Sequence, residues 1–250
     1  MWSLILMKKF TRFKRQIGKA SADFEMIQNG DKFLIPIDTD YPHLSLAAFF
    51  QQKNIVLPDS KPLCIIHFHS SEEPSSETVD YLDKFCAKRK ITYSCKKVEN
   101  VTSRTLYKKV LIDTALEFEC NKIALPDSLD YLDASILSNM AFNAVFTGPS
   151  VIEKVETDGQ TVTFIRPFCY LTDEEIEKLG EVNEFPNAPT GIRISENEEM
   201  AIARRAMNHF LDGTSNIRMN FFNAQSNIQK KYIGNGDNEE PIHFTEDVEI

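Results

Sequence analysis

The stretch DKFLIPIDTDYPHLSLAAFF, residues 31–50, predicts a buried strand, a short loop and the beginning of a helix. The apolar run FLIPI at 33–37 is typical of a parallel strand covered on both faces, and LSLAAFF at 44–50 is typical of a helix. In nucleotide-binding α/β proteins, a glycine-rich phosphate loop usually joins such a strand to such a helix. The loop DTDYPH, Asp38 to His43, has no glycine and two carboxylates. The stretch therefore predicts the scaffold of a phosphate site without its chemistry.

Strands and helices alternate along the residues that follow. Apolar runs predict strands at 63–68, 91–95 and 122–125. Apolar residues at helical spacing predict three core-facing stripes: Val79, Leu82, Phe85 and Cys86; Leu111, Ala115 and Phe118; Leu129, Leu132, Ile136 and Met140. This alternation indicates an α/β fold, a parallel sheet with helices on both faces. Ligands of such sheets bind beyond the carboxyl ends of the strands, which here are the loops DTDYPH, HFHSS and PDSLD.

The chain is predicted to divide into four segments. Residues 1–30 form a basic N-terminal helix, and residues 31–150 form the α/β domain. Residues 151–233 contain a hairpin and a helical extension, in which Thr172 with Glu175 and Ser195 with Glu198 have capping-box spacing. Residues 234–250 form an acidic tail with six acids and two glycines, for which we expect disorder.

Composition limits the partners and the location. A net charge of -9 gives no overall attraction to nucleic acid, so DNA is not expected as a partner and RNA would need a local basic patch. The apolar start MWSLILM is too short to span a membrane, and we expect a soluble, cytoplasmic protein. The five cysteines include no C-x-x-C pair, which favours buried small side chains over disulfides or a metal cage.

Basic residues offer one candidate RNA contact surface. Lys8, Arg12, Arg15 and Lys19 fall on one face of the N-terminal helix, and no acid precedes Asp23. The face is either simply solvated or a stripe that contacts RNA phosphates. Arg166 in FIRPF is a further candidate, for an ion pair with the helical extension or for RNA.

Acids and histidines offer a candidate metal site. Asp38, Asp40 and His43, with Asp130 facing them, contain the oxygen and imidazole groups that bind divalent ions. His67 at the end of a strand could join them. The alternative is that the loop residues cap the next helix and turn the chain.

A second acidic series has a structural interpretation. Asp127, Asp130 and Asp133 recur every three residues at the beginning of a predicted helix. Asp127 is expected to cap this helix, and the other two to favour its positive end.

Several segments resemble one family. IGKASADFEMIQNGDKFLI, FIRPFCYLTDEEIEKL and EFPNAP are similar to segments of the tRNA 2-thiocytidine synthetases, a branch of the PP-loop ATP pyrophosphatase superfamily, and the similarity runs from about Leu6 to Ile228. The resemblance implies a HUP-like (PP-loop) parallel-sheet domain with a C-terminal helical extension. It also implies activation of a cytidine carbonyl by ATP and magnesium, and sulfur transfer that uses an iron–sulfur cluster held by cysteines.

The chain departs from the family at the motifs that carry this chemistry. The family's S-G-G-x-D-S loop falls on residues that include no glycine or serine: Asp38, Thr39, Asp40, Tyr41, Pro42 and His43. The family's G-H-H-x-D-D element falls on residues 126–131, which include Asp127. Asp130 is the only residue of this segment that matches the motif. The two C-x-x-C motifs fall near 100–103 and on 190–193, where no cysteine occurs.

These departures predict a pseudoenzyme that has no cofactor and acts by binding. Its partner would be another protein, a second copy of the chain, or tRNA held by the basic N-terminal helix. The alternative is a divergent tRNA-modifying or nucleotide-dependent enzyme with a metal site rebuilt around Asp38, Asp40, His67 and Asp130.

Overall fold

The computed structural model describes residues 2–54, 59, 61–70, 73–157, 159–210 and 217–227, with side chains from Thr11 onward except that of Asn54. The side chain of Lys8 and the acidic tail predicted at 234–250 lie outside this description. None of the helices in these ranges is both long enough and apolar enough to cross a membrane.

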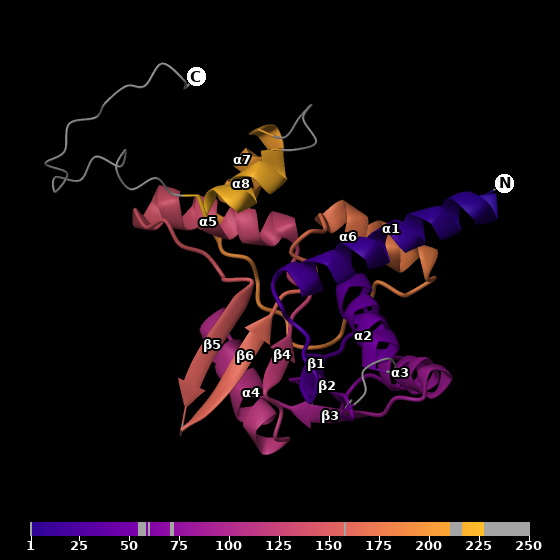
Figure 1. Ribbon diagram of the computed structural model, residues 1–250. Coiled ribbons are helices and arrows are strands. Elements are labelled where there is room, and N and C mark those ends of the chain that lie inside the picture. Colours follow the sequence, from indigo (N-terminus) through magenta and orange to yellow (C-terminus); the bar gives the residue numbers. More distant parts are fainter. Residues whose placement is uncertain are drawn as a thin grey trace, which may run out of the picture.

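A mostly parallel sheet of six strands forms the centre of the molecule (Figure 1). Its strands, in spatial order, are β3 (Tyr93–Lys97), β2 (Cys64–His69), β1 (Phe33–Pro36), β4 (Lys122–Ala124), β6 (Gln160–Ile165) and β5 (Ile152–Thr157). Only β5 runs antiparallel to its neighbour within these described residues. The predicted parallel α/β sheet is confirmed, and the predicted hairpin joins the same sheet as its β5–β6 edge.

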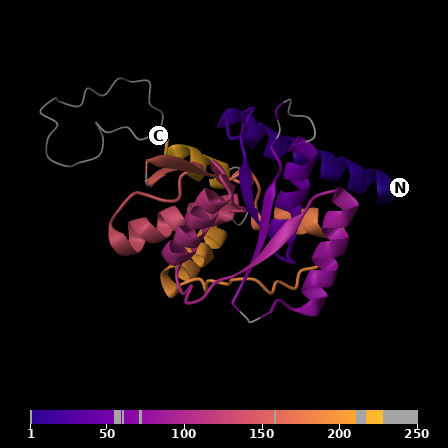
Figure 2. The same ribbon diagram turned by 90° about the horizontal axis from the view of Figure 1, so that it is seen from below.

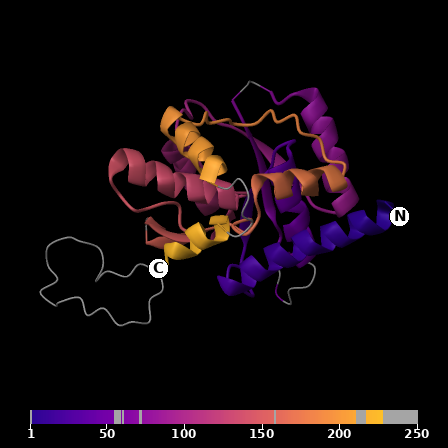
Figure 3. The same cartoon turned by 90° about the horizontal axis from the view of Figure 1, so that it is seen from above.

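Helices cover both faces of the sheet. They are α1 (Trp2–Asp23), α2 (Tyr41–Asn54), α3 (Ser76–Arg89), α4 (Arg104–Glu117), α5 (Leu129–Asn143), α6 (Asp173–Val182), α7 (Glu198–Phe210) and α8 (Ile217–Ala224). Side chains of α1, α2, α3 and α6 pack with Phe33 and Ile35 on one face, and α4 packs with Leu34 and Ile66 on the other. The strands accordingly lie between α4 and the pair α2 and α3 (Figure 2), and α1 runs beside α6 (Figure 3).

Two predicted core residues are exposed. Phe118 is 36% exposed because α4 ends one residue before it, and Met140 is 42% exposed near the end of α5. Helical periodicity assigned both to the core, and it was wrong because it does not reveal where a helix extends past the layer that covers it.

The cysteines are only partly buried as predicted. Cys86, Cys120 and Cys169 are buried, Cys64 is half-buried and Cys95 is exposed. Cys95 lies on β3, the edge strand of the sheet, whose side chains are mostly accessible to solvent.

Three helix caps test the local predictions. The capping box of Thr172 and Glu175 is present, with both reciprocal hydrogen bonds. The cap of α7 is Asn197 rather than Ser195, because the Asn197 side chain accepts a hydrogen bond from the backbone N–H of Met200 at 2.9 Å. The cap of α5 is Ser128 rather than Asp127.

Candidate functional site

A later segment of the chain lies across the loop that follows β1. We call residues 186–194, between α6 and α7, the strap. The backbone N–H of Ala188 donates to the Thr39 carbonyl at 2.8 Å, and the Thr39 hydroxyl donates to the Ala188 carbonyl at 2.7 Å. The Asp38 carboxylate accepts hydrogen bonds from the backbone N–H groups of Thr190 and Gly191, both at 3.0 Å. The strap is thus fixed to the positions that a phosphate loop would occupy.

The strap also reaches the end of β2. The backbone N–H of Ile192 donates to the Phe68 carbonyl at 3.0 Å. A side chain at Gly191 would place its Cβ 2.9 Å from both this carbonyl oxygen and Asp38 Oδ2, so only glycine fits without a shift. The Thr190 hydroxyl is 2.8 Å from the hydroxyl of Thr78 on α3. Polar groups at the ends of two central strands are therefore bound by the chain itself.

Asp40 caps α2. Its Oδ1 accepts a hydrogen bond from the backbone N–H of His43 at 3.0 Å and lies 2.7 Å from the His43 Nδ1. This explains why α2 begins at Tyr41, three residues before the predicted 44. Pro42 stands in the first turn, where a missing N–H breaks no helical hydrogen bond. Asp40 therefore caps the next helix, as the alternative to a metal site predicts for this loop.

Burial and attraction compete at this pair. Burial disfavours the charged form of each group, but the attraction and hydrogen bonding between them are larger in sum. They lower the pKa of Asp40 and raise the pKa of His43, so each group favours the charged form of the other. Arg193 of the strap lies 3.9 Å from Asp40 on the other side.

His67 is fully buried beneath the loop. Its Nδ1 donates to the Ile37 carbonyl at 3.0 Å and lies 4.0 Å from Asp38 Oδ1. Its ring is parallel to that of His69, with centroids 6.0 Å apart. Nε2 is buried and finds no hydrogen-bond partner among the described residues.

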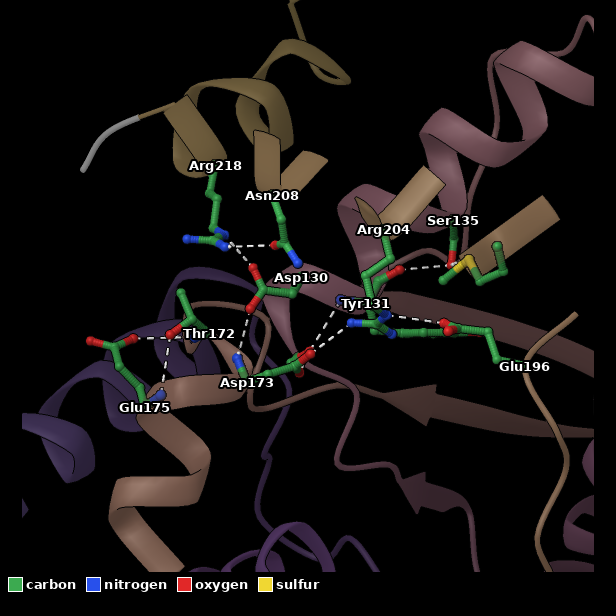
Figure 4. Close-up of polar contacts among 12 residues, drawn as sticks. Asp130, Tyr131, Ser135, Thr172, Asp173, Glu175, Glu196, Arg204, Asn208 and Arg218 are labelled. Carbon is green, nitrogen blue, oxygen red and sulfur yellow. Dashed lines mark hydrogen bonds and ion pairs between the residues drawn. The ribbon is translucent and has the colours of Figure 1, made fainter. Parts of the chain in front are cut away.

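Asp130 lies in a different cluster, which joins the C-terminal helices to the domain (Figure 4). Its carboxylate accepts a hydrogen bond from the backbone N–H of Asp173 at 2.8 Å and pairs with Arg218 of α8. Arg204 of α7 pairs with Asp173 at 2.6 Å and with Glu196 at 3.0 Å. Burial raises the pKa of Asp130 despite these partners. The residue at the retained motif position therefore links α5 to α6 and α8.

The four metal candidates are divided between these places. Asp38 and Asp40 lie beneath the strap, His67 lies next to Asp38, and Asp130 belongs to the helix junction. Within the described ranges, no three His, Cys, Asp or Glu side chains are arranged to hold a metal ion.

Sequence reasoning missed the buried carboxyl of Asp133. The side chain is completely inaccessible, and neither oxygen has a hydrogen-bond partner among the described residues. Burial and the neighbouring Asp130 raise its pKa to about 8, although Arg218 opposes the shift. A sequence signal was available, because position 133 is one helical turn after Leu129 on the core-facing side.

A cleft of about 500 Å³ opens beside the strap, at the carboxyl ends of β1 and β4. Arg166 in its wall is 5% exposed and donates to Asp127 at 2.8 Å, with Glu153 3.5 Å away. The guanidinium of Arg104 lies 4.2 Å from the centroid of the Tyr131 ring. Arg166 is thus occupied by carboxylates and offers RNA little surface, whereas Arg104 is exposed.

The basic face of α1 is partly neutralised. Arg12 pairs with Glu175 of α6 at 3.1 Å, and Lys19 pairs with Asp23 at 2.5 Å. Arg15 is exposed. Among the candidate RNA contacts with described side chains, two of the three α1 cations already have acidic partners.

The residues do not fit the groups that the resemblance implies. A triphosphate needs free backbone N–H donors, but those of Thr39 and His43 already donate to Asp38 and Asp40. An iron–sulfur cluster needs thiolates, but the strap presents Thr190 and Arg193 at the corresponding positions. These two backbone donors and these two strap positions therefore do not supply what the implied groups need.

Comparison with known proteins finds similarity to proteins named as tRNA-modifying enzymes. No family model matches it. A tRNA-cytidine(32) 2-sulfurtransferase of Paraburkholderia phytofirmans is 26% identical over 244 residues, covering 90% of this chain and 71% of the relative. The resemblance to the tRNA 2-thiocytidine synthetase branch is confirmed. The corresponding enzyme of Paraburkholderia xenovorans is 25% identical, with the same coverage.

A solved structure supports the fold of this branch. The U34-tRNA thiolase NcsA from Methanococcus maripaludis, determined with its [4Fe-4S] cluster, has a TM-score of 0.68. It is 15% identical, and the alignment covers 88% of this chain and 78% of the thiolase. This similarity establishes a common PP-loop-type α/β fold.

Proposed function

We propose that this chain is a non-catalytic relative of the tRNA-thiolating PP-loop enzymes that acts by binding a macromolecule. The observation that carries the proposal is the pairing of Asp38 with the backbone N–H groups of Thr190 and Gly191. It uses the loop position for an internal contact, where an ATP-using enzyme would leave donors for phosphate. The proposal includes a cytoplasmic location, since tRNA modification takes place there.

Electrostatics support the same conclusion. A triphosphate at this loop would lie beside the carboxylates of Asp38 and Asp40, which are less than a tenth exposed. Each repulsion would cost about 1 kcal/mol at solvent-exposed distances and more in a buried site. The nucleotide would also have to displace the strap, which loses at least four hydrogen bonds in that event.

Two surfaces support a binding role. The tRNA in the names of the sulfurtransferase relatives suggests tRNA as a partner, and the exposed Arg15 on α1 is a candidate contact. Large apolar side chains exposed at and beyond the end of α5 suggest a protein contact instead: Met140, Phe142, Val145 and Phe146.

Calorimetry with ATP and magnesium tests the loss of the nucleotide site. We expect no heat of binding, because the backbone N–H groups of Thr39 and His43 already donate to Asp38 and Asp40. A micromolar dissociation constant would refute the proposal.

Fluorescence anisotropy with labelled tRNA tests the partner. We expect binding that falls at least several-fold in Arg12→Ala/Arg15→Ala and is unchanged in Lys154→Ala, an exposed cation on β5. If tRNA does not bind and light scattering shows a dimer or complex, the partner is a protein.

The cleft beside β4 favours one alternative, a divergent enzyme with a rebuilt site. Its volume of about 500 Å³ suits a small ligand, and His43, Asp127 and Arg104 line it. This alternative predicts that the purified protein contains a divalent metal, which Asp40→Ala loses. Elemental analysis that finds no metal would exclude a rebuilt metal site.

A further inference from the structure

A small pocket of about 40 Å³ lies between α1, α2, α3 and α6. These four helices cover the same face of the sheet (Figure 1), and the pocket shares no lining residue with the cleft beside the strap. Part of its lining is apolar, from Ile17 of α1, Phe49 of α2 and Leu179 of α6. This volume exceeds what one water molecule needs and is far below that of a pocket for a whole nucleotide. The pocket therefore suits a single small group, either free or at the end of a larger ligand.

Polar side chains from all four helices or their ends complete the lining. They are, in chain order, Lys14, Ser45, Gln52, Arg89 and Asn183. Ser45 and Gln52 are two turns apart and so share one face of α2, and Arg89 is the last residue of α3. None of the described lining residues is acidic. Two cations therefore border the pocket without a carboxylate in its wall.

The Arg89 guanidinium is positioned by its neighbours and has no carboxylate partner among the described residues. It lies 3.8 Å from the centroid of the Phe85 ring and 5.5 Å from that of Phe185, and it donates to the Phe85 carbonyl at 3.3 Å. Burial lowers the pKa of Arg89, and the two groups that oppose this effect, Tyr81 and Cys86, ionise only at high pH. Arginine stays protonated in spite of such a shift. An anion in the pocket would therefore meet a positioned and partly desolvated charge.

Ser45 and Lys14 provide two further donors. Ser45 is 5% exposed, and its Oγ is buried with no hydrogen-bond partner among the described residues. Buried hydroxyl groups ordinarily have such a partner, and an oxygen atom of a ligand in the pocket would supply it. The Lys14 Nζ donates to Gln52 Oε1 at 2.6 Å, and burial lowers the pKa of Lys14. A negative ligand would offset the effect of burial on this charge.

We propose that this pocket binds a phosphate group, which Arg89 and Lys14 hold by charge and Ser45 by a hydrogen bond. A guanidinium group matches the oxygen atoms of phosphate, and an ammonium group adds a point charge. Two sources present this group, a small phosphate ester and the backbone of an RNA. Exposed cations adjoin the lining residues in the sequence, as contact with RNA requires: Arg15, Lys88 and Lys90. The site does not depend on the proposed function, because a phosphate ester would occupy it whether or not the chain binds tRNA.

Titration of the full-length chain with inorganic phosphate at constant ionic strength tests the proposal. NMR should show saturable shifts of the backbone amide signals around Ser45 and Arg89. Acetate, which carries one charge and two oxygen atoms, should bind at least several-fold more weakly. The absence of saturable shifts, or an equal affinity for acetate, would overturn the proposal.

Variants connect the binding to the pocket. Arg89→Gln and Lys14→Gln should each weaken phosphate binding about tenfold, because each removes a charge-assisted hydrogen bond. Arg205→Gln, at an exposed arginine of α7 outside the pocket, is the matched control and should bind like the wild type. Ser45→Ala should weaken phosphate binding without lowering the free energy of unfolding in the absence of phosphate, because it removes a buried hydroxyl that has no partner. If all three pocket variants bind phosphate as the wild type does, the anion binds elsewhere and the proposal is wrong.

Fluorescence anisotropy with labelled tRNA identifies the source of the phosphate. If Arg89→Gln weakens the binding of both tRNA and phosphate, the group belongs to an RNA backbone. If it weakens phosphate binding alone, or if the wild type does not bind tRNA, the ligand is a small ester. The second result still supports the pocket, so a failure of the proposed tRNA binding is distinguishable from a failure of this proposal.

Discussion

Asp133 allows a quantitative test of the helix junction. Its carboxyl group is fully buried on α5 without a hydrogen bond, and the charged groups that act on it are Asp130 on the same helix and Arg218 on α8. The pKa rises from 3.8 to about 8 on folding, so the folded state holds the proton more tightly than the unfolded chain. The contribution is therefore most favourable at low pH and is lost as the pH rises from about 4 to about 8.

The magnitude follows from the same shift. Between pH 5 and pH 7 the carboxyl is ionised in the unfolded chain and protonated in the folded one, so unfolding releases a proton and the free energy of unfolding falls by up to about 3 kcal/mol. Asp133→Asn removes the titration and keeps the size of the side chain. We expect the stability of the wild type to fall relative to this variant by that amount over this range.

Urea denaturation at pH 5, 6 and 7 measures the difference. Asp113→Asn, an exposed position on α4, is the matched control and should follow the wild type. If the curves of the wild type and Asp133→Asn stay parallel, the carboxyl is not buried in the way described, and the reasoning fails.

Three further predictions concern the strap and its loop. Gly191→Ala should lower the free energy of unfolding by about 1–3 kcal/mol, because the new Cβ would lie 2.9 Å from two oxygen atoms. The control Gly18→Ala should not destabilise the protein, because nothing lies within 4 Å of a Cβ at that position. Urea denaturation measures the stability of both variants. Asp40→Ala should cost about 1–2 kcal/mol through the lost cap. In this variant the pKa of His43, followed by NMR titration, should be lower than in the wild type. In the wild type, the raised pKa stabilises the folded state below about pH 6.5, and this contribution is lost as the pH rises through the pKa of His43 in the folded state. The variant should lack this contribution. Asp38→Ala should speed hydrogen exchange of the strap amides, and unchanged exchange would show that the strap does not depend on this carboxylate.

The sequence predicts what depends on local patterns. Apolar runs located the strands, and Thr172 and Glu175 located the beginning of α6, because a capping box involves residues only three apart. Local patterns could not predict the strap contact. Asp38 and Gly191 are separated by most of the chain, and the residues around each do not indicate that the two are in contact. The predicted burial of Phe118 and Met140 was wrong for a similar reason, because how far a neighbouring layer covers a helix depends on tertiary structure.

Under the proposed function, the contact between Asp38 and the strap makes a return to nucleotide binding difficult. Two backbone donors in the strap depend on this one carboxylate, so a small residue in its place would leave both donors without this partner. Glycines at the loop alone would weaken the protein before any ligand could compensate. A path back to catalysis would require the segment above the loop to change at the same time as the loop. Under that proposal, a single substitution in the loop or in the strap would break this contact without creating a nucleotide site.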